Sequence, residues 1–405
     1  MHPSEKLAIR ANIAKLNWFR FFKWGDLLVV IEPLFFMAAG LTFSEYLKIM
    51  AIWMLFTFLL EIPSGALADF IGRKNTLIIS QAAQITQYGI YIFANSFWMF
   101  LVAKIFGAAA YSFQSGTDSS LLYDSVKAIN LEKDFKKING KRHFMFYIGI
   151  AVFFPLGAFL FSIYFRLAAI VGLFFMFICL FIILLMKEVN LTRRIVSFKR
   201  YLNHISSALK IASKNKKIRF FIFFSLIIFS VLDYVHSSWS LYLQKISIPI
   251  AAIGVFSALV ALVSALSSKA AHRIEKNIGG KRSLFFIGII FGLLIFLHSL
   301  LVPYWGLLFF IVTGIITGYL MVIVESNLHE NIKTKHRATI LSINNQIKAI
   351  GAGILFYGLS QVSVAYSFPA TYIITSIGVI GLVLILFLFP IIRKLFTKNA
   401  NKRAL

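Results

Sequence analysis

Charged and titratable side chains stand inside several long apolar stretches of this 405-residue sequence. An ionisable group in the hydrocarbon of a membrane costs at least ~2.5 kcal/mol, so such a residue is a functional candidate wherever the stretch around it spans a bilayer. Acids, lysines and histidines in such places can carry a proton, hold an ion or pair with one another. The candidates for coupling or for a substrate cavity are Asp26, Glu32, Lys104, Asp118, Asp233, His236 and Lys348.

Asp233 and His236 are three residues apart, so they share one face of the expected helix. Histidine titrates near neutral pH and responds to a neighbouring acid, which makes this pair the first candidate for carrying protons. Glu32, beside Pro33, is the second candidate, and Asp26 is a further buried carboxylate. A polar pair that only fixes helix packing is the alternative for Asp233 and His236. Lys348 could pair with a carboxylate or bind an anionic group, and its residue type leaves both open.

The composition indicates what kind of protein surrounds these groups. Hydrophobic residues make up 59% of the chain and charged residues only 14%, whereas about a quarter of an ordinary soluble domain is charged. The sequence therefore predicts an integral membrane protein. The net charge of +26 does not indicate nucleic acid binding, because the bases stand in short segments between apolar runs, where they orient a protein in the membrane.

Twelve apolar runs are long enough to cross a bilayer, which takes roughly 20 helical residues. We expect these helices at 17–40, 44–68, 74–94, 97–120, 142–162, 166–187, 218–243, 249–271, 283–301, 304–328, 338–361 and 369–394. The longest connection follows the sixth helix. The predicted fold is all-α, with an N-terminal six-helix bundle at 1–187, a cytoplasmic linker at 188–217, and a C-terminal six-helix bundle with a cytoplasmic tail at 218–405.

The linker is basic, and its segment HISSALKIASKNKK could form an amphipathic helix on an anionic membrane surface. A solvated connection with no role beyond topology is the alternative. Within the spans, Pro33, Pro63 and Pro155 each remove a backbone donor, which predicts a bend in the first, second and fifth helices.

Lysine and arginine are distributed unevenly between the two ends of the predicted helices. Of the 41 such residues, 36 lie in or near the N-terminal segment, the even-numbered connections and the tail, three lie in or at the edge of the odd-numbered connections, and two lie well within spans. Cytoplasmic segments of membrane proteins carry the excess of these residues. The pattern predicts a multi-pass protein of the cytoplasmic membrane with both termini in the cytoplasm.

A crowded polar segment, EIPSGALADFIGRKNTL at 61–77, joins the second and third predicted helices. Its residues Gly65, Leu67, Asp69, Gly72, Arg73 and Lys74 match in place the G-x-L-a-D-r-x-G-R-K signature of the major facilitator superfamily, which the chain therefore resembles. Phe70 stands where the family usually has a base. A degenerate copy, EKNIGGKRSL, occupies the equivalent place in the second half, and RATILS at 337–342 resembles efflux-like bacterial members.

The resemblance implies a mechanism for this segment. Asp69 is expected to engage the start of the eleventh helix, near Arg337, where the helix dipole is positive. Arg73 is expected to pair with an acid at the end of the fourth helix, with Asp124 as first choice and Asp118 as second. These contacts would close a cytoplasmic gate. Lys104 lies near the place of a fourth-helix arginine in many members, and FPLGAF at 154–159 is a partial version of a motif associated with antiporters.

The function that the resemblance implies is secondary active transport of a small, amphipathic organic solute by alternating access, with proton-coupled export. A proton-coupled importer and a non-transporting sensor on the same scaffold are the alternatives. An enzyme is not indicated, because the sequence has no G-x-x-x-x-G-K-[ST] loop and no H-E-x-x-H pair. We expect a monomer in a lipid bilayer whose partners are a substrate and a proton, with no cofactor, no metal and no nucleic acid.

Cysteine labelling tests the predicted orientation. With Cys179 replaced, single cysteines at Asn95 and Asn139 are treated with a membrane-impermeant thiol reagent on intact cells. The distribution of basic residues predicts that the cysteine at Asn95 is labelled and the one at Asn139 is not. The reverse pattern would contradict the orientation.

Overall fold

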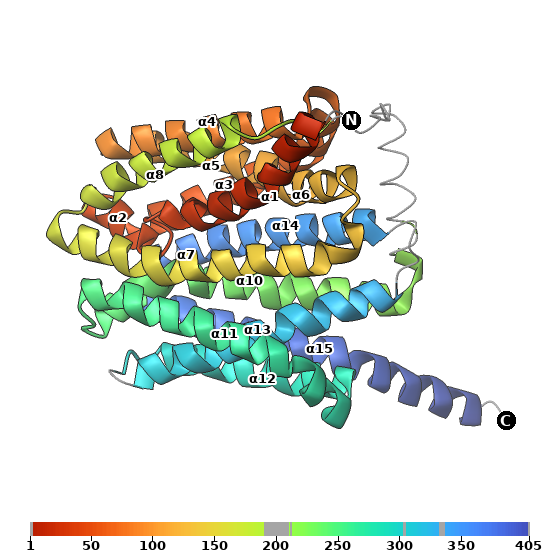
Figure 1. The fold of residues 1–405 in the computed structure, drawn as a ribbon. Helices are drawn as coiled ribbons and strands as arrows, with labels where there is room; N and C mark the ends of the chain where they lie inside the picture. The colour runs from red at the N-terminus through yellow and green to blue at the C-terminus, as the bar shows by residue number, and fades with distance from the viewer. Residues whose placement is uncertain (1–2, 190–209, 211–212, 303–304, 332–336, 404–405) are drawn as a thin grey trace. The chain divides into compact units, whose positions relative to one another are not determined.

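The computed structural model describes residues 3–189, 210, 213–302, 305–331 and 337–403. These residues form helices and connecting turns, and no strand occurs among them (Figure 1). The elements of the first half are α1 (Pro3–Phe22), η1 (Lys23–Gly25), α2 (Glu32–Ala38), α3 (Phe43–Ile71), α4 (Arg73–Phe93), α5 (Phe97–Gln114), α6 (Thr117–Ala128), η2 (Glu132–Asp134), α7 (Phe135–Ile163) and α8 (Leu167–Leu184). The second half contains α10 (Lys216–Lys245), α11 (Ile250–Ile278), α12 (Gly280–His298), α13 (Trp305–Asn331), α14 (Arg337–Ala365) and α15 (Phe368–Arg403).

Each of the twelve predicted spans coincides with one of these helices or with a consecutive pair. Within the described residues, nine segments are long and apolar enough to cross a membrane on those criteria alone. The other three predicted spans do not meet these criteria. The first span is broken, the third (α4) carries many polar residues, and the ninth (α12) is short. The fold is an all-α membrane fold of twelve spans, as predicted.

Two spans that were predicted as single helices are broken. In the first span, the chain leaves the helical conformation at 26–31, between η1 and α2. Pro33 was expected to bend a continuous helix, and that expectation is wrong, because Pro33 lies in the first turn of α2, where no backbone donor is needed. Pro63 and Pro155 do lie inside helices, α3 and α7.

The fourth span is interrupted at Ser115 and Gly116 and continues as α6. The polar run SGTDSS favours turns and helix starts over a helix interior, because its short side chains compete with the backbone for hydrogen bonds. The break creates an additional helix N-terminus at Thr117, next to Asp118.

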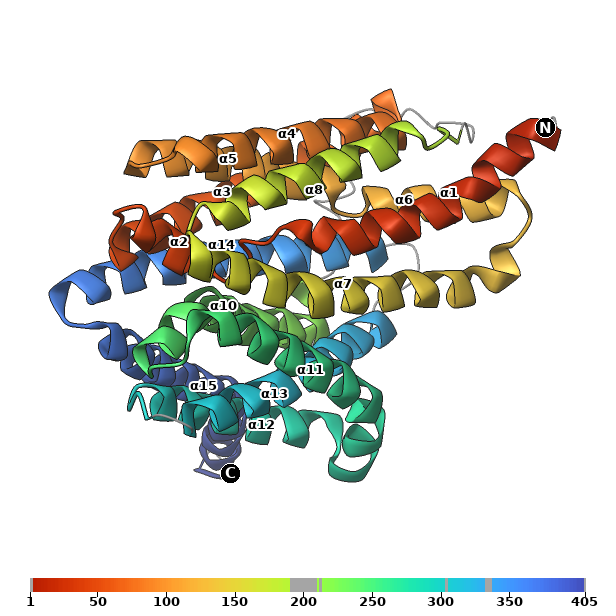
Figure 2. The same cartoon turned by 60° about the vertical axis from the view of Figure 1, so that its left-hand side comes forward.

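The chain divides into two compact units, Met1–Leu202 with Ser237–Leu262, and Asn203–His236 with Val263–Leu405. In the first unit, α4 packs against α5 and α8, and α1 packs against α6, α7 and α8 (Figure 2). In the second unit, α12 packs between α13 and α15. Most of the predicted linker lies outside the described residues, so its amphipathic helix and the division at 188–217 stay predictions.

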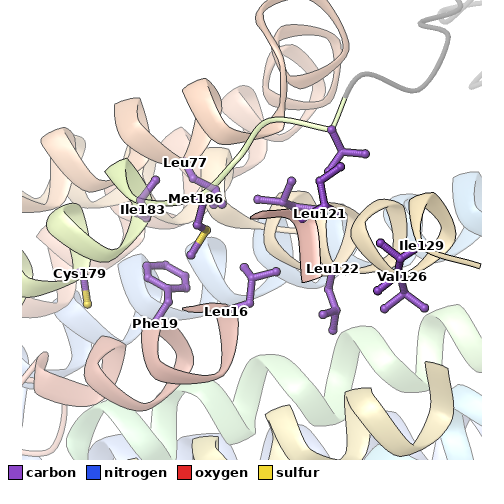
Figure 3. Packing of buried hydrophobic residues seen from close by; sticks show 12 residues of the cluster. Leu16, Phe19, Leu77, Leu121, Leu122, Val126, Ile129, Cys179, Ile183 and Met186 are labelled. Atoms are coloured by element: carbon purple, nitrogen blue, oxygen red, sulfur yellow. The ribbon is translucent and has the colours of Figure 1, made fainter. Parts of the chain in front are cut away.

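A hydrophobic cluster in the first unit fixes the end of the bundle that carries the polar segment 61–77 (Figure 3). Leu16 and Phe19 of α1, Leu121 of α6 and Ile183 of α8 are all buried in it. Its other members are Ile9, Leu77, Leu122, Val126, Ile129, Cys179, Met186 and Val189. The cluster joins four helices, so the turn between α3 and α4 is held against a packed core.

Gly72 connects α3 to α4 with φ 98° and ψ 158°, a conformation that is almost restricted to glycine. We expect Gly72→Ala to lower the free energy of unfolding by about 1–3 kcal/mol, measured as thermal or denaturant unfolding of the purified protein in detergent. Gly89→Ala is the matched control, because Gly89 lies inside α4 and an added Cβ there meets no atom within 4 Å. Equal effects of the two substitutions would contradict the explanation.

Candidate functional site

One face of α4 is polar and buried inside the first unit. Gln84, Gln87, Tyr88 and Tyr91 are spaced three and four residues apart, so they form a stripe along one side of the helix. The stripe faces the broken first span, where Asp26 and Glu32 lie. These residues were not predicted, because only ionisable groups were considered as candidates. Their helical spacing within an apolar stretch was the signal that could have found them.

Asp26 is held by two side chains of this stripe. The Tyr88 hydroxyl donates to Asp26 Oδ1, and Gln84 Nε2 donates to Asp26 Oδ2 at 3.4 Å. Lys23 of η1 donates to Gln84 Oε1 at 3.1 Å, so it reaches Asp26 through an amide. Because the chain is not helical at 26–31, these side-chain contacts are what position the carboxylate.

Glu32 forms an ion pair with Lys104 of α5. The distance between Lys104 Nζ and Glu32 Oε1 is 2.5 Å, and the two side chains are 7% and 15% exposed. The Tyr91 hydroxyl donates to the same Glu32 oxygen at 3.5 Å, and the lysine ammonium also lies 5.1 Å from the centre of the Trp53 ring, within cation–π range. The carboxylate of Glu32 on α2 therefore neutralises the ammonium of Lys104 on α5.

The two carboxylates belong to one hydrogen-bond network. Gln84 Nε2 donates to Gln87 Oε1 at 3.0 Å, and Gln87 Nε2 donates to the Tyr91 hydroxyl at 2.9 Å. The route from Asp26 to Glu32 thus runs through Gln84, Gln87 and Tyr91. Gln87 is accommodated because Gly107 of α5 has no side chain, since a Cβ there would lie 2.6 Å from Gln87 Oε1. We use the name α4 network for a set of eight residues: Lys23, Asp26, Glu32, Gln84, Gln87, Tyr88, Tyr91 and Lys104.

Asp118 stands apart from the α4 network. Its Oδ2 lies 3.3 Å from Arg20 Nη1 and 3.1 Å from Arg142 Nη1. Asp118 was predicted to be one of the cavity residues and was also the second choice as partner of Arg73. The structure places it instead between two arginines of α1 and α7.

Arg73 pairs with Asp124, the first choice from the sequence, with Arg73 Nε 2.7 Å from Asp124 Oδ2. A further acid that the sequence analysis did not name, Glu188, accepts from the backbone amides of Arg73 at 3.2 Å and of Lys74 at 2.8 Å. Its carboxylate thereby caps the N-terminus of α4, where a negative charge is favourable. Lys74 Nζ donates to the Leu184 carbonyl of α8 at 2.8 Å.

The remaining residues of the predicted gating signature are placed less completely. Gly65 and Asp69 lie within α3 and are exposed. Arg337 is the first residue of α14, and its side chain lies outside the described residues. The expected contact between Asp69 and the start of that helix stays a prediction.

In the second unit, Asp233 and His236 lie on α10, and Lys348 lies on α14. The Lys348 Nζ lies 4.8 Å from the centre of the Phe229 ring, within cation–π range. Asp233 and Lys348 are both half-buried, and His236 is exposed. No cluster of side chains that could hold a metal ion is found within the described residues.

The sequence matches the family model of the Major Facilitator Superfamily over residues 18–356. The chain belongs to the major facilitator superfamily. The chain is thus a multi-pass membrane protein with the fold of this family of transporters. No curated protein sequence is a match to this chain.

Solved structures of transporters share the fold. A mutant of the nucleoside transporter NupG is similar with a TM-score of 0.78 at 14% identity, covering 93% of this chain and 98% of that chain. The POT family transporter PepTSo has a TM-score of 0.75 at 14% identity, covering 98% and 99%. A D-xylose–proton symporter has a TM-score of 0.68 at 11% identity, covering 94% and 97%. At these identities the likeness concerns the fold alone.

Substitutions at the ion pair of Glu32 and Lys104 test its energetics. We expect Glu32→Gln to destabilise the purified protein by about 3–5 kcal/mol, because it leaves the lysine buried without a counter-charge. Adding Lys104→Met should recover most of this loss, since removing both charges is often close to neutral. Thermal unfolding in detergent measures both, with Glu132→Gln, an exposed acid on η2, as control. A double variant no more stable than Glu32→Gln alone would contradict the pairing.

Proposed function

We propose that this protein is a secondary active transporter that moves a small organic solute by alternating access and couples the movement to protons through Glu32 and Asp26. Membership in the transporter family supports transport as such. The observation that carries the coupling is the buried ion pair between Glu32 and Lys104 within a membrane span. Groups of this kind are costly in a membrane and are retained for ion and proton pathways.

The geometry of the α4 network suggests how a proton would act. A proton on Glu32 would remove the negative charge that holds Lys104, and the lysine would then be available to another anion or would leave its position. The loss of charge on Glu32 would also affect Asp26, because Gln84 and Gln87 connect the two acids. From Gln84 to Tyr91 the network extends ~10 Å along α4, about a third of the hydrocarbon thickness.

The orientation with both termini in the cytoplasm is part of the proposal. It assigns the α3–α4 turn to the cytoplasmic side and Glu32 to the outer half of the membrane, so external protons would reach Glu32 before Asp26. The pairs of Arg73 with Asp124 and of Glu188 with the start of α4 would then brace the cytoplasmic gate. Asp69 would close that gate against the start of α14.

For the substrate we propose an amphipathic solute moved outward, as the sequence suggested. Aromatic residues surround the few fixed charges of the α4 network, as Trp53, Tyr88 and Tyr91 illustrate. Uptake in symport with protons is the second candidate, since the same network can load a proton from outside in either mode. We propose a monomer in the cytoplasmic membrane.

Transport in proteoliposomes tests the coupling. A ligand is first found by thermal shift among drugs, sugars, nucleosides, peptides and siderophores, because binding raises the stability of the folded state. We expect an imposed pH gradient to drive its accumulation in the wild type, and Glu32→Gln to abolish accumulation while downhill exchange continues. Asp233→Asn, in the other unit, tests the first choice from the sequence, and Glu132→Gln is the control.

Two outcomes would contradict the proposal. In one, the wild type ignores the pH gradient and responds only to sodium or to substrate on the far side. In the other, Glu32→Gln and Glu132→Gln accumulate the ligand equally. Loss of accumulation in Asp233→Asn alone would move the coupling to the second unit.

A further inference from the structure

Arg20, Arg142 and Asp118 form a cluster of charges in which positive charge exceeds negative charge. Both guanidinium groups contact the same carboxylate oxygen, Asp118 Oδ2. The other oxygen, Oδ1, accepts from the backbone amide of Ser119 at 2.6 Å. One carboxylate is therefore shared by two arginines and by the N-terminus of α6, whose dipole adds further positive charge.

Arg142 is the least satisfied member of the cluster. The residue is 6% exposed, and among the described residues its Nε and Nη1 have no hydrogen-bond acceptor. The approach of Nη1 to Asp118 at 3.1 Å is thus a contact of charges without hydrogen-bond geometry. Unpaired donors of a buried guanidinium are costly, which points to a partner with oxygen acceptors.

The other charged clusters of the first unit do not share this excess. Lys104 is matched by Glu32, and Arg73 is matched by Asp124. Further titratable groups near Arg20 and Arg142 are Lys23, His143 and Tyr111, none of which is a carboxylate. The cluster is therefore short of at least one negative charge.

We propose that Arg20 and Arg142 form a binding site for a phosphate group. Two guanidinium forks can share the several oxygens of one phosphate, which is the geometry for which arginine is preferred. The Arg20 side chain is 24% exposed, so the phosphate enters from the side of Arg20, and the donors of Arg142 complete the site from within. The phosphate belongs either to a soluble anion or to a lipid headgroup, because both present the same chemistry. The site does not depend on the proposed coupling.

Binding of inorganic phosphate to the purified, delipidated full chain tests the proposal. Phosphate replaces chloride at constant ionic strength, and the unfolding temperature is followed as a function of its concentration. We expect a saturable rise in the wild type, because a ligand of the folded state stabilises it. Arg142→Gln and Arg20→Gln should each weaken the apparent affinity at least about tenfold.

Two further variants distinguish a specific phosphate site from nonspecific attraction of phosphate by nearby positive charge. Lys141→Gln removes a neighbouring positive charge from an exposed position and should leave phosphate binding unchanged. Asp118→Asn should lower stability in phosphate-free buffer and bind phosphate more tightly than the wild type, because the competing carboxylate is gone. A role of Asp118 in packing alone would lower stability without raising the affinity.

The source of the phosphate is distinguished by a parallel titration with short-chain phosphatidylglycerol, with phosphatidylcholine for comparison. A saturable rise with inorganic phosphate assigns the site to a soluble anion, and a rise with phosphatidylglycerol alone assigns it to a lipid. The proposal is wrong if neither ligand stabilises the wild type, or if Lys141→Gln weakens binding as much as Arg142→Gln. If Asp118→Asn does not fold, the comparison of these two variants decides.

Discussion

Lys104 carries a full positive charge on a helix that must lie in a membrane, and the carboxylate of Glu32 makes this possible. Their contact at 2.5 Å is the constraint on which the interior of the first unit depends. Because the two side chains are only 7% and 15% exposed, each charge has to find its counter-charge within the protein. The break in the first span brings Glu32 to the start of α2, and the stripe on α4 supplies the hydrogen bonds that an ion pair leaves unmade.

The two broken spans have a common consequence. The non-helical residues 26–31 place Asp26 and Glu32 against the same face of α4. The interruption before α6 provides a helix N-terminus that binds Asp118 through the Ser119 amide. In both cases the helix is interrupted at the place where a carboxylate is bound. Irregular backbone at membrane depth is tolerated only inside protein or beside a water-filled cavity, which agrees with sites of function at these two places.

Much of this could be predicted from the sequence. The twelve apolar runs and the signature at 65–74 were sufficient for the fold and the family, because length and hydrophobicity decide which segments span a bilayer. The pair of Arg73 with Asp124 was named from the resemblance and is present. The break at 26–31 was not predicted, since residues 27–31 are as apolar as a helix interior. The contacts of Asp26 with Tyr88 and Gln84, which hold this segment, are visible only in the structure. Gln84 and Gln87 could have been found from their helical spacing within an apolar stretch, but a search for ionisable groups passes over amides. Glu188 was missed because a single acid at a helix end has no signature without its partner.

The proposed coupling predicts that the protonation of Glu32 depends on Asp26, because the α4 network connects the two carboxylates. Infrared absorption of the Glu32 carboxylate tests it most directly, isolated by subtracting the spectrum of Glu32→Gln from that of the wild type at each pH. The account predicts that Asp26→Asn changes the pH midpoint of Glu32, and that this dependence disappears in a Gln87→Leu background, where the route from Gln84 to Tyr91 is cut. An identical midpoint of Glu32 with and without Asp26 would contradict it.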